Sequence, residues 1–169
     1  KYMGLEIKRS TTPKICKEAM IRGCELIFDE DQEGLFDHVQ RFHRGYSKKK
    51  YSVVEIAQPT GVKGLDKYAD PRAIYLKGCP IHVRAALMYN HLLRHFHLDN
   101  VYAPIRNGDK IKHVRLKEIN PTNQNVMAVV GGFPEEFQLD DYVDYETMYE
   151  KTFFEAMKRI SDAAGFDLV

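Results

Sequence analysis

Helical periodicity is clearest in "PKICKEAMIRGCELIFDEDQEGLFDHVQRFHRGY", residues 13–46. Apolar or small residues of its first half return every three or four positions: Cys16, Met20, Gly23, Cys24 and Ile27. After the polar break "DEDQEG" (29–34), the same spacing resumes at Leu35, Val39, Phe42 and Tyr46. Residues spaced in this way share one face of an α-helix. The stretch therefore predicts two amphipathic helices joined by a short link, an αα-hairpin.

The rest of the chain predicts further helices and a small sheet. Pro80 begins a third helix, and a fourth follows "PEEFQLDDYVD" (134–144). The stretches "KIKHVRLKEI" (110–119) and "VMAVVGG" (126–132) are strand-like and are joined by a turn. Residues 1–9 are expected to be extended, and residues 47–56 to be a basic turn that enters a strand. The predicted fold class is α+β, a helix-dominated domain with a small antiparallel sheet.

The composition is that of a globular protein, with 44% hydrophobic and 29% charged residues. No run of about 18 apolar residues occurs, so we expect no transmembrane helix. No signal peptide is visible, and the chain begins with Lys1 rather than Met, which suggests a piece cut from a longer protein. The three cysteines lack CxxC spacing and are expected to be buried, reduced thiols of a cytoplasmic protein.

Charge is distributed unevenly along the sequence. Residues 1–117 carry 22 Lys and Arg against 13 Asp and Glu, whereas residues 118–169 carry 3 against 11. A basic portion of this kind favours a polyanionic partner. A solvated surface on which charges cluster by chance is the alternative.

One stretch concentrates hydrogen-bond donors, "GLEIKRSTTPK" (4–14). Pro13 suits the first position of a helix, which makes Thr12 the expected N-cap. A helix N-terminus offers free N–H groups and a partial positive charge. With the hydroxyls of Ser10 and Thr11 and the cations Lys8, Arg9 and Lys14, this end predicts a phosphate cradle. The alternative is an ordinary capped helix beside a solvated basic segment.

Two further basic stretches fit the same theme. In "KGCPIHVRAALMYN" (77–90), Lys77 precedes a helix that carries His82 and Arg84 in its first turns. Cations there oppose the helix dipole, which leaves room for an anion, unless His82 packs in the core. "KKKY" (48–51) could follow a phosphate backbone or form a solvated turn.

Metal binding and catalysis have weaker support in the sequence than phosphate binding. His91 and His95 stand four residues apart, as metal-binding pairs do, but no Glu follows His91 as in HExxH. A small metal-dependent hydrolase is therefore only a less favoured alternative. The carboxylates of "LDDYVDY" (139–145) could hold Mg²⁺, but they better suit the entry to a helix. No GxxxxGK loop occurs, and the spacing shows no Ser/His/Asp arrangement.

Four stretches resemble, in the same order, the C-terminal part of the family B DNA polymerases of T4-like bacteriophages. They are "MGLEIKRSTTPK" (3–14), "CPIHVRAALMYN" (79–90), "EINP" with "NQNV" (118–126) and "DYETMYEKTFFEAMKRI" (144–160). The resemblance runs the whole length of the chain. It covers the last strand of the palm and the thumb, which implies a palm-edge remnant at residues 1–10 and a thumb domain at 11–169.

The resemblance implies a DNA-holding role. In this family the thumb grips the primer–template duplex along its backbone and minor groove, while the palm carries the metal-binding aspartates. The family's DNA contacts match the segment from Lys8 to Pro13, and also Lys67, Tyr68, Arg84 and Lys151. Its lysine before "CP" resembles Lys77, displaced by one residue by Gly78.

The sequence also departs from the family. The catalytic palm motifs are absent, so the chain is expected to be inactive alone, with no cofactor of its own and with Mg²⁺ in the missing palm. "KKKY" lies in the wrong place for the family's primer-contact motif. The family ends in an aromatic tail for the sliding clamp, whereas this chain ends in "GFDLV".

The expected partners are duplex primer–template DNA and the palm and exonuclease part of a polymerase. A sliding clamp is expected only if a C-terminal tail is missing here, and no membrane partner is expected. The resemblance places the protein in the cytoplasm of a bacterial host, encoded by a phage. A free-standing, non-specific nucleic-acid-binding protein is the main alternative.

Overall fold

The computed structural model describes residues 5–168, and side chains from Ile7 onward. The helices are α1 (Leu5–Lys8), α2 (Lys14–Phe28), α3 (Gln32–Ser47), α4 (Val53–Ile56), α5 (Leu65–Tyr68), α6 (Ile81–His95), α7 (Tyr145–Tyr149) and α8 (Glu155–Ala163). The strands are β1 (Gln58–Gly61), β2 (Lys110–Arg115) and β3 (Val126–Val129). Short 3₁₀ turns span Glu135–Phe137 and Asp140–Tyr142. The predicted α+β class is confirmed.

The chain forms two compact units. The first combines the N-terminal part up to Gln58 with the chain from Tyr145 onward, and the second spans Pro59–Asp144. The predicted division at residues 1–10 and 11–169 remains a prediction, and residues 1–4 lie outside the described part.

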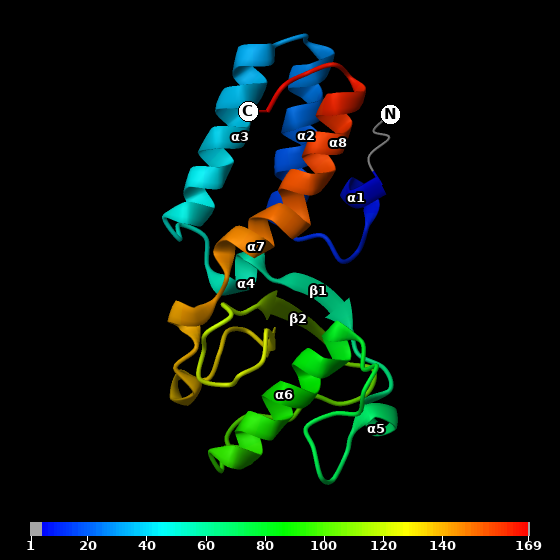
Figure 1. Cartoon of the computed structure of the whole chain (residues 1–169), viewed down its shortest axis with the longest axis vertical. Coiled ribbons are helices and arrows are strands. Elements are labelled where there is room, and N and C mark those ends of the chain that lie inside the picture. Colours follow the sequence, from blue (N-terminus) through cyan, green and yellow to red (C-terminus); the bar gives the residue numbers. More distant parts are fainter. Residues whose placement is uncertain (1–4, 169) are drawn as a thin grey trace. The chain divides into compact units, whose positions relative to one another are not determined.

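The first unit is built on the predicted αα-hairpin. Helices α2 and α3 lie side by side with α8, as Figure 1 shows. The link between α2 and α3 is short, and the Asp31 carboxylate caps α3 by accepting a hydrogen bond of 2.8 Å from the N–H of Gly34. This cap satisfies one of the N–H groups that a helix start leaves without a partner.

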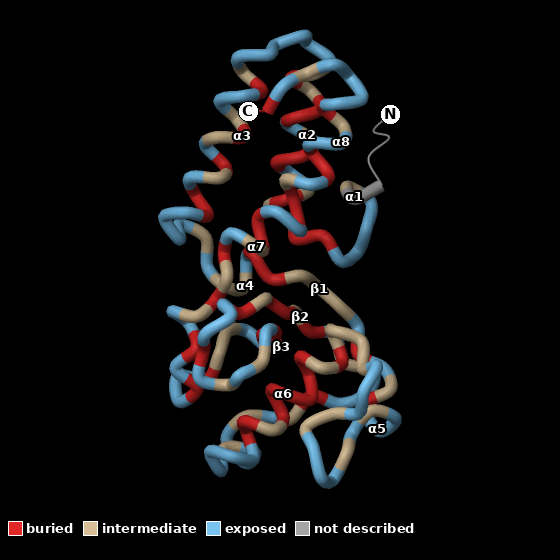
Figure 2. Tube along the Cα trace, in the orientation of Figure 1, coloured by how far each residue is buried: buried red, intermediate tan, exposed pale blue. Residues whose placement is uncertain are grey.

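An aromatic cluster fills the core of the first unit. Phe42 packs edge-on against Tyr46 and Phe153, with ring centroids 5.2 and 4.7 Å apart. Tyr46 is fully buried, and its hydroxyl lies 3.2 Å from the Cys16 sulfur. The tube in Figure 2 shows the buried positions on the sides of α2, α3 and α8 that face one another. Aromatic pairs in such geometry add to the free energy gained from burial alone.

The helix that returns from the second unit is not regular. A π-helical segment, Glu150–Phe154, lies between α7 and α8. The buried Thr152 hydroxyl donates a hydrogen bond to the Met148 carbonyl and lies 3.4 Å from the Cys16 sulfur. A hydroxyl that bonds back to the preceding turn competes with the helical hydrogen bonds, so it suits a wider turn.

The second unit is a three-stranded sheet covered by one helix. The strand order is β1-β2-β3, and β2 pairs antiparallel with β3, with Val114 opposite Met127. Helix α6 packs against β3. The buried Asn90 side chain exchanges hydrogen bonds of 2.8 and 2.9 Å with the backbone of Ile105. This exchange fixes the loop that follows α6 against the helix.

A tight loop connects β2 to β3. The Asn120 amide donates to the carbonyls of Lys117 and Gln124, both at 2.7 Å, and its oxygen accepts from the N–H and hydroxyl of Thr122. Ile119, at the outer side of this loop, is 87% exposed. Because its polar groups are internally bonded, the loop presents its outer side chains in a fixed arrangement.

Three local predictions were wrong. Leu5–Lys8 is helical rather than extended. Val53–Ile56 is a helix rather than a strand, because Ser52 and Glu55 form a capping box that starts a helical turn. Pro13 rather than Thr12 occupies the cap position of α2.

The expected buried thiols are found at Cys16 and Cys24, while Cys79 is half-buried. Across residues 5–168, no helix combines the length and the apolar character needed to cross a bilayer.

The aromatic core gives a direct stability test. Phe153 is completely buried, whereas its neighbour Phe154 is half-buried. We expect Phe153→Ala to lower the free energy of unfolding by about 3–5 kcal/mol, because it removes apolar surface and leaves a cavity. Phe154→Ala, the matched control, should cost less than half as much. Chemical denaturation of both variants measures the difference, and equal losses would contradict this account of the core.

Candidate nucleic-acid interface

The predicted cradle lies at the start of α2 in the first unit. Lys8 ends α1, and a turn follows in which the N–H of Thr12 donates to the carbonyl of Arg9 at 3.3 Å. The side chains of this segment that face solvent are Lys8, Arg9, Ser10, Thr11 and Lys14. The structure thus leaves these cations and hydroxyls exposed on both sides of the buried residues Thr12 and Pro13.

Thr12 does not play its predicted part. It is 7% exposed, and no side chain caps α2. Pro13 takes the cap position with an extended backbone, so the Thr12 side chain packs inward one residue before the helix entry. The start of α2 therefore keeps free N–H groups, which a helix leaves in its first turn.

Lys151 lies in the π-helical segment of the first unit. Its side chain is exposed, and its ammonium nitrogen is 3.3 Å from a carboxylate oxygen of Glu155. Exposed ion pairs of this kind contribute little to stability. Lys151 can therefore exchange this carboxylate for another anion at low cost.

The remaining predicted residues belong to the second unit. Lys67 and Tyr68 end the short helix α5, with the Lys67 nitrogen 5.3 Å from the centre of the Tyr68 ring. Lys77 is exposed beside Gly78, whose φ of 83° lies in the left-handed region that glycine favours. Lys67 is thus presented from a short helix and Lys77 from a turn.

Arg84 is the most firmly held cation of the predicted set. Its guanidinium donates a hydrogen bond of 2.9 Å to the Asn125 side chain and lies over the Tyr75 ring at 5.7 Å. The Tyr75 hydroxyl in turn donates to the Gln124 side chain at 2.9 Å. The segment before α6 and the β2–β3 loop thus fix this side chain together.

Two basic side chains on β2 lie near Arg84. His113 and Arg115 are two positions apart, so they share one face of the strand. Burial, then the charges of Arg115 and His82, lower the pKa of His113 to about 4. Burial and the charge of Arg84 lower the pKa of Arg115. With a pKa of about 4, His113 is neutral near pH 7, and we call His82, Arg84, His113 and Arg115 the α6–β2 basic cluster.

Sequence reasoning missed half of this cluster. It placed His82 and Arg84 at the start of a helix and residues 110–119 on a strand, but it assigned no role to His113 or Arg115. Their alternation on the strand indicates a shared face. Nothing in the local sequence shows that the start of α6 lies near these two side chains.

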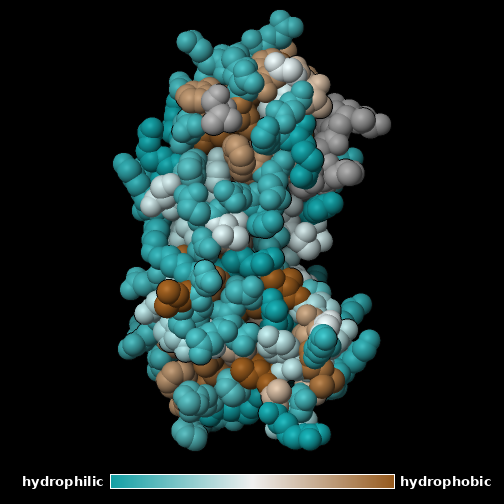
Figure 3. All heavy atoms as spheres, viewed as in Figure 1, coloured by the Kyte–Doolittle hydropathy of each residue, from teal (hydrophilic) through white to brown (hydrophobic). Residues whose placement is uncertain are grey.

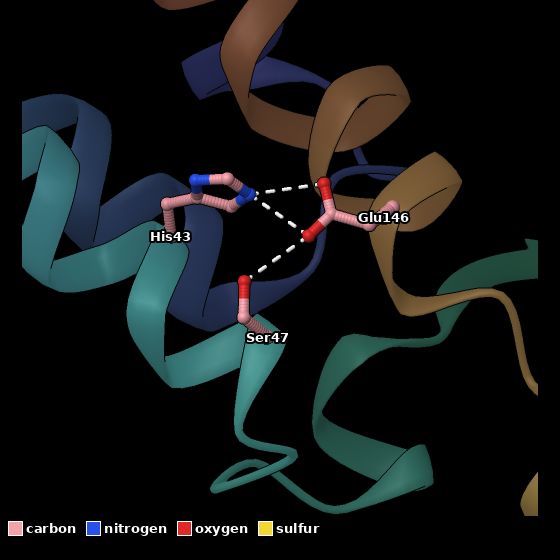
Figure 4. Close-up of polar contacts among 3 residues, drawn as sticks. All are labelled: His43, Ser47 and Glu146. Atoms are coloured by element: carbon pink, nitrogen blue, oxygen red, sulfur yellow. Dashed lines mark hydrogen bonds and ion pairs between the residues drawn. The ribbon is translucent and has the colours of Figure 1, made fainter.

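The structure also brings together a serine, a histidine and a glutamate, as Figure 4 shows. Nε2 of His43 lies 2.8 and 2.9 Å from the two carboxylate oxygens of Glu146, and the Ser47 hydroxyl donates to the same carboxylate at 3.1 Å. In a nucleophilic triad the imidazole bridges the other two groups. Here the carboxylate is central, so the cluster joins α3 to α7 and does not activate the serine.

The histidine pair on α6 does not form a metal centre. The rings of His91 and His95 stack with centroids 6.3 Å apart. Among residues 5–168, no three His, Cys, Asp or Glu side chains gather in a way that could hold a metal ion.

One face of the molecule is mostly polar. On the face shown in Figure 3, hydrophilic residues predominate and hydrophobic ones form separate small patches. A polar, cation-bearing surface suits contact with a hydrated, charged partner.

Comparison with known proteins adds sequence relationships to this geometry. No family model matches the chain. It is 29% identical over 171 residues to the DNA-directed DNA polymerase of Enterobacteria phage T4, and 28% identical over 172 residues to that of Escherichia phage RB69. The chain is similar in sequence to these two phage DNA polymerases along almost its whole length. The resemblance expected from the sequence is therefore confirmed.

The match covers nearly all of this chain but only a small part of each polymerase. It covers 99% of this chain but 18% of each relative. The chain therefore spans about a fifth of the length of these relatives. The predicted DNA contacts lie within the matching segment, on both compact units.

His113 should make stability depend on pH. His113 has a pKa of about 4 in the folded protein, against 6.5 for an ordinary histidine. Between these pH values the unfolded chain therefore binds more protons than the folded one. The contribution of His113 to the free energy of unfolding should be fully present above pH 6.5. It should fall by about 3 kcal/mol as the pH drops to 4, at about 1.4 kcal/mol per pKa unit. Urea unfolding at several pH values measures this loss.

A pair of variants isolates the contribution. His113→Asn should flatten the dependence of the unfolding free energy on pH between 6.5 and 4. His97→Asn, at an exposed position with φ of 55° that asparagine tolerates, should keep it. An unchanged pH profile in His113→Asn would assign the dependence to other groups.

Proposed function

We propose that this chain is the DNA-holding thumb region, with a palm-edge remnant, of a T4-like family B DNA polymerase. In that role it grips the backbone of the primer–template duplex while a palm elsewhere carries out synthesis. The observation that supports this most is the match of 99% of the chain to one segment of two phage DNA-directed DNA polymerases.

The geometry of the cations supports a backbone-gripping role. The exposed cations of the cradle segment, Lys8, Arg9 and Lys14, stand beside two hydroxyls and a helix start that no side chain caps. In the second unit, Arg84 is held in place by Asn125 and Tyr75. Charged donors on fixed backbone elements bind phosphates without reading base sequence.

Catalysis is assigned to the missing palm. Phosphoryl transfer by two metal ions requires carboxylates that hold the ions about 3.5–4 Å apart. In the family these are the palm aspartates, which the chain's motifs do not include. We propose that Mg²⁺ binds there, and that this chain contributes the positioning of the duplex.

Non-specific duplex binding tests the proposal. Each phosphate that a protein neutralises contributes about 0.9 to the slope of log affinity against log salt. With ~4–5 phosphate contacts we expect a slope of about −4 for the chain, independent of base sequence. Fluorescence anisotropy with two unrelated duplexes between low and physiological salt measures it. A flat salt response, or strong preference for one duplex, would exclude this role.

The cradle segment can be tested by charge removal. Lys8→Ala with Arg9→Ala should lower duplex affinity and make the salt slope shallower by about 2, because two phosphate contacts are lost. Both side chains are exposed, so the melting temperature should barely change. The matched control, Lys48→Ala with Lys50→Ala, removes two exposed charges of the same unit that lie outside the proposed interface.

The comparison between the two double variants decides the role of the cradle. If the Lys8/Arg9 variant binds the duplex as the wild type does across the salt range, the cradle does not contact the DNA. Equal losses in both double variants would indicate diffuse attraction by net charge instead.

A further inference from the structure

Two neighbouring polar residues at the end of the β2–β3 loop join it to the segments on either side of the start of α6. The Asn125 side chain accepts a hydrogen bond of 2.9 Å from the Arg84 guanidinium. The preceding residue, Gln124, accepts one of 2.9 Å from the Tyr75 hydroxyl. The Tyr75 ring also lies against the guanidinium, with its centre 5.7 Å away. We call Tyr75, Gln124 and Asn125 the loop bridge.

The loop bridge provides the contacts that orient the Arg84 side chain. Among the side chains that the structure describes, Arg84 takes part in no ion pair, and Asn125 is the acceptor of its guanidinium hydrogen bond. The Nε of Arg84 is buried without a hydrogen-bond partner. A long side chain that is held by one acceptor and one ring face loses its orientation when either is removed.

The loop can hold Arg84 because its own backbone is internally bonded. Asn120 is 8% exposed, and its amide donates to the Gln124 carbonyl at 2.7 Å. Gln124 is therefore fixed twice, through its backbone carbonyl to Asn120 and through its side chain to Tyr75. Supporting hydrogen bonds of this kind keep a side chain close to one geometry.

The loop bridge also reaches a second predicted DNA contact. Tyr75 belongs to the loop before α6, and Lys77 follows it by two residues. Between them, the N–H of Leu76 donates to the Tyr68 carbonyl at 2.8 Å. The loop that presents Lys77 is thus held by α5 on one side and by the loop bridge on the other. Both Lys77 and Arg84 depend on the same uncharged residues for their positions.

We propose that Gln124 and Asn125 are positioning residues for duplex binding. They contact Tyr75 and Arg84 rather than the DNA, and they hold Arg84 in its binding orientation before the duplex arrives. Pre-orientation reduces the side-chain freedom that is lost on binding, so it raises affinity without adding a charge. This inference rests on the proposed duplex-binding function and deepens it, because it assigns a role to two uncharged residues outside the predicted contacts.

The first arm of the test measures duplex affinity and its salt dependence by fluorescence anisotropy. Asn125→Ala removes the acceptor but no cation. Duplex affinity should therefore fall about 3- to 10-fold, the cost of immobilising one long side chain on binding. The slope of log affinity against log salt should stay as in the wild type, because the charges are unchanged. Arg84→Gln should instead make the slope shallower by about 1.

A matched control and a double-mutant cycle complete this arm. Asn100→Ala makes the same change at an exposed position of the same unit and should leave affinity unchanged. If Asn125 acts through Arg84, Asn125→Ala should have no further effect in the Arg84→Gln background. A residue that only stabilises the fold would lower affinity equally in both backgrounds. Melting temperatures confirm that the variants are folded.

The second arm uses a milder variant and observes the arginine directly. Tyr75→Phe removes the hydroxyl that donates to Gln124 and keeps the ring against the guanidinium. It should cause a smaller loss of affinity than Asn125→Ala, and Gln124→Met should add nothing to it, because both remove the same bond. Nuclear spin relaxation of the Arg84 Nε–H group in the free protein should show increased motion in Asn125→Ala.

The outcomes separate this inference from the general function. Losses that are coupled to Arg84 at an unchanged salt slope, together with increased motion of its side chain, support it. Equal losses in both backgrounds, or wild-type affinity in Asn125→Ala, overturn it and leave the proposed function in place. A wild-type chain without salt-dependent duplex binding overturns the proposed function, and this inference with it.

Discussion

The buried contact of Cys16 with Tyr46 and Thr152 is the constraint on which the first unit depends. It joins α2, α3 and the π-helical segment, and Cys16 and Thr152 are 136 residues apart in the sequence. Burial raises the pKa of the Cys16 thiol, so it stays protonated in this contact. The N-terminal hairpin therefore has a complete core only when the last helix has returned to it. Closing so long a loop costs entropy that the buried aromatic cluster must offset.

In the sequence, the second unit lies between the two segments of the first. Its cations are brought together in a different way. There a sheet and one covering helix bring cations from α6 and β2 together, and a tight loop holds Arg84 through Asn125. In the first unit, by contrast, the exposed cations Lys8, Arg9 and Lys14 come from one short stretch of the chain, at the end of α1 and the start of α2. Both arrangements set positive groups at a helix start that lacks a side-chain cap, where an anion finds free N–H groups.

Local patterns predicted the sites only in part. The basic residues before α2 and at the start of α6 were found because proline and the neighbouring charges mark helix starts in the sequence. Thr12 was wrongly predicted as the N-cap, because sequence patterns place a helix start only to within one or two residues, and the cap is Pro13. The contact of Glu146 with His43 and Ser47 was missed, since residues 103 and 99 positions apart leave no local pattern.

The sequence by itself determined the α+β class, the helical hairpin, the strand pair β2 and β3, and the resemblance to T4-like polymerases. These follow from periodicity, turn residues and motif order, which are local properties. Only the tertiary structure decided that the chain forms two units, that the start of α6 lies near His113 and Arg115, and that a π-helical turn seats Thr152 against Cys16. These features depend on contacts between distant residues, whose free energy is set by packing and burial rather than by neighbours in the sequence.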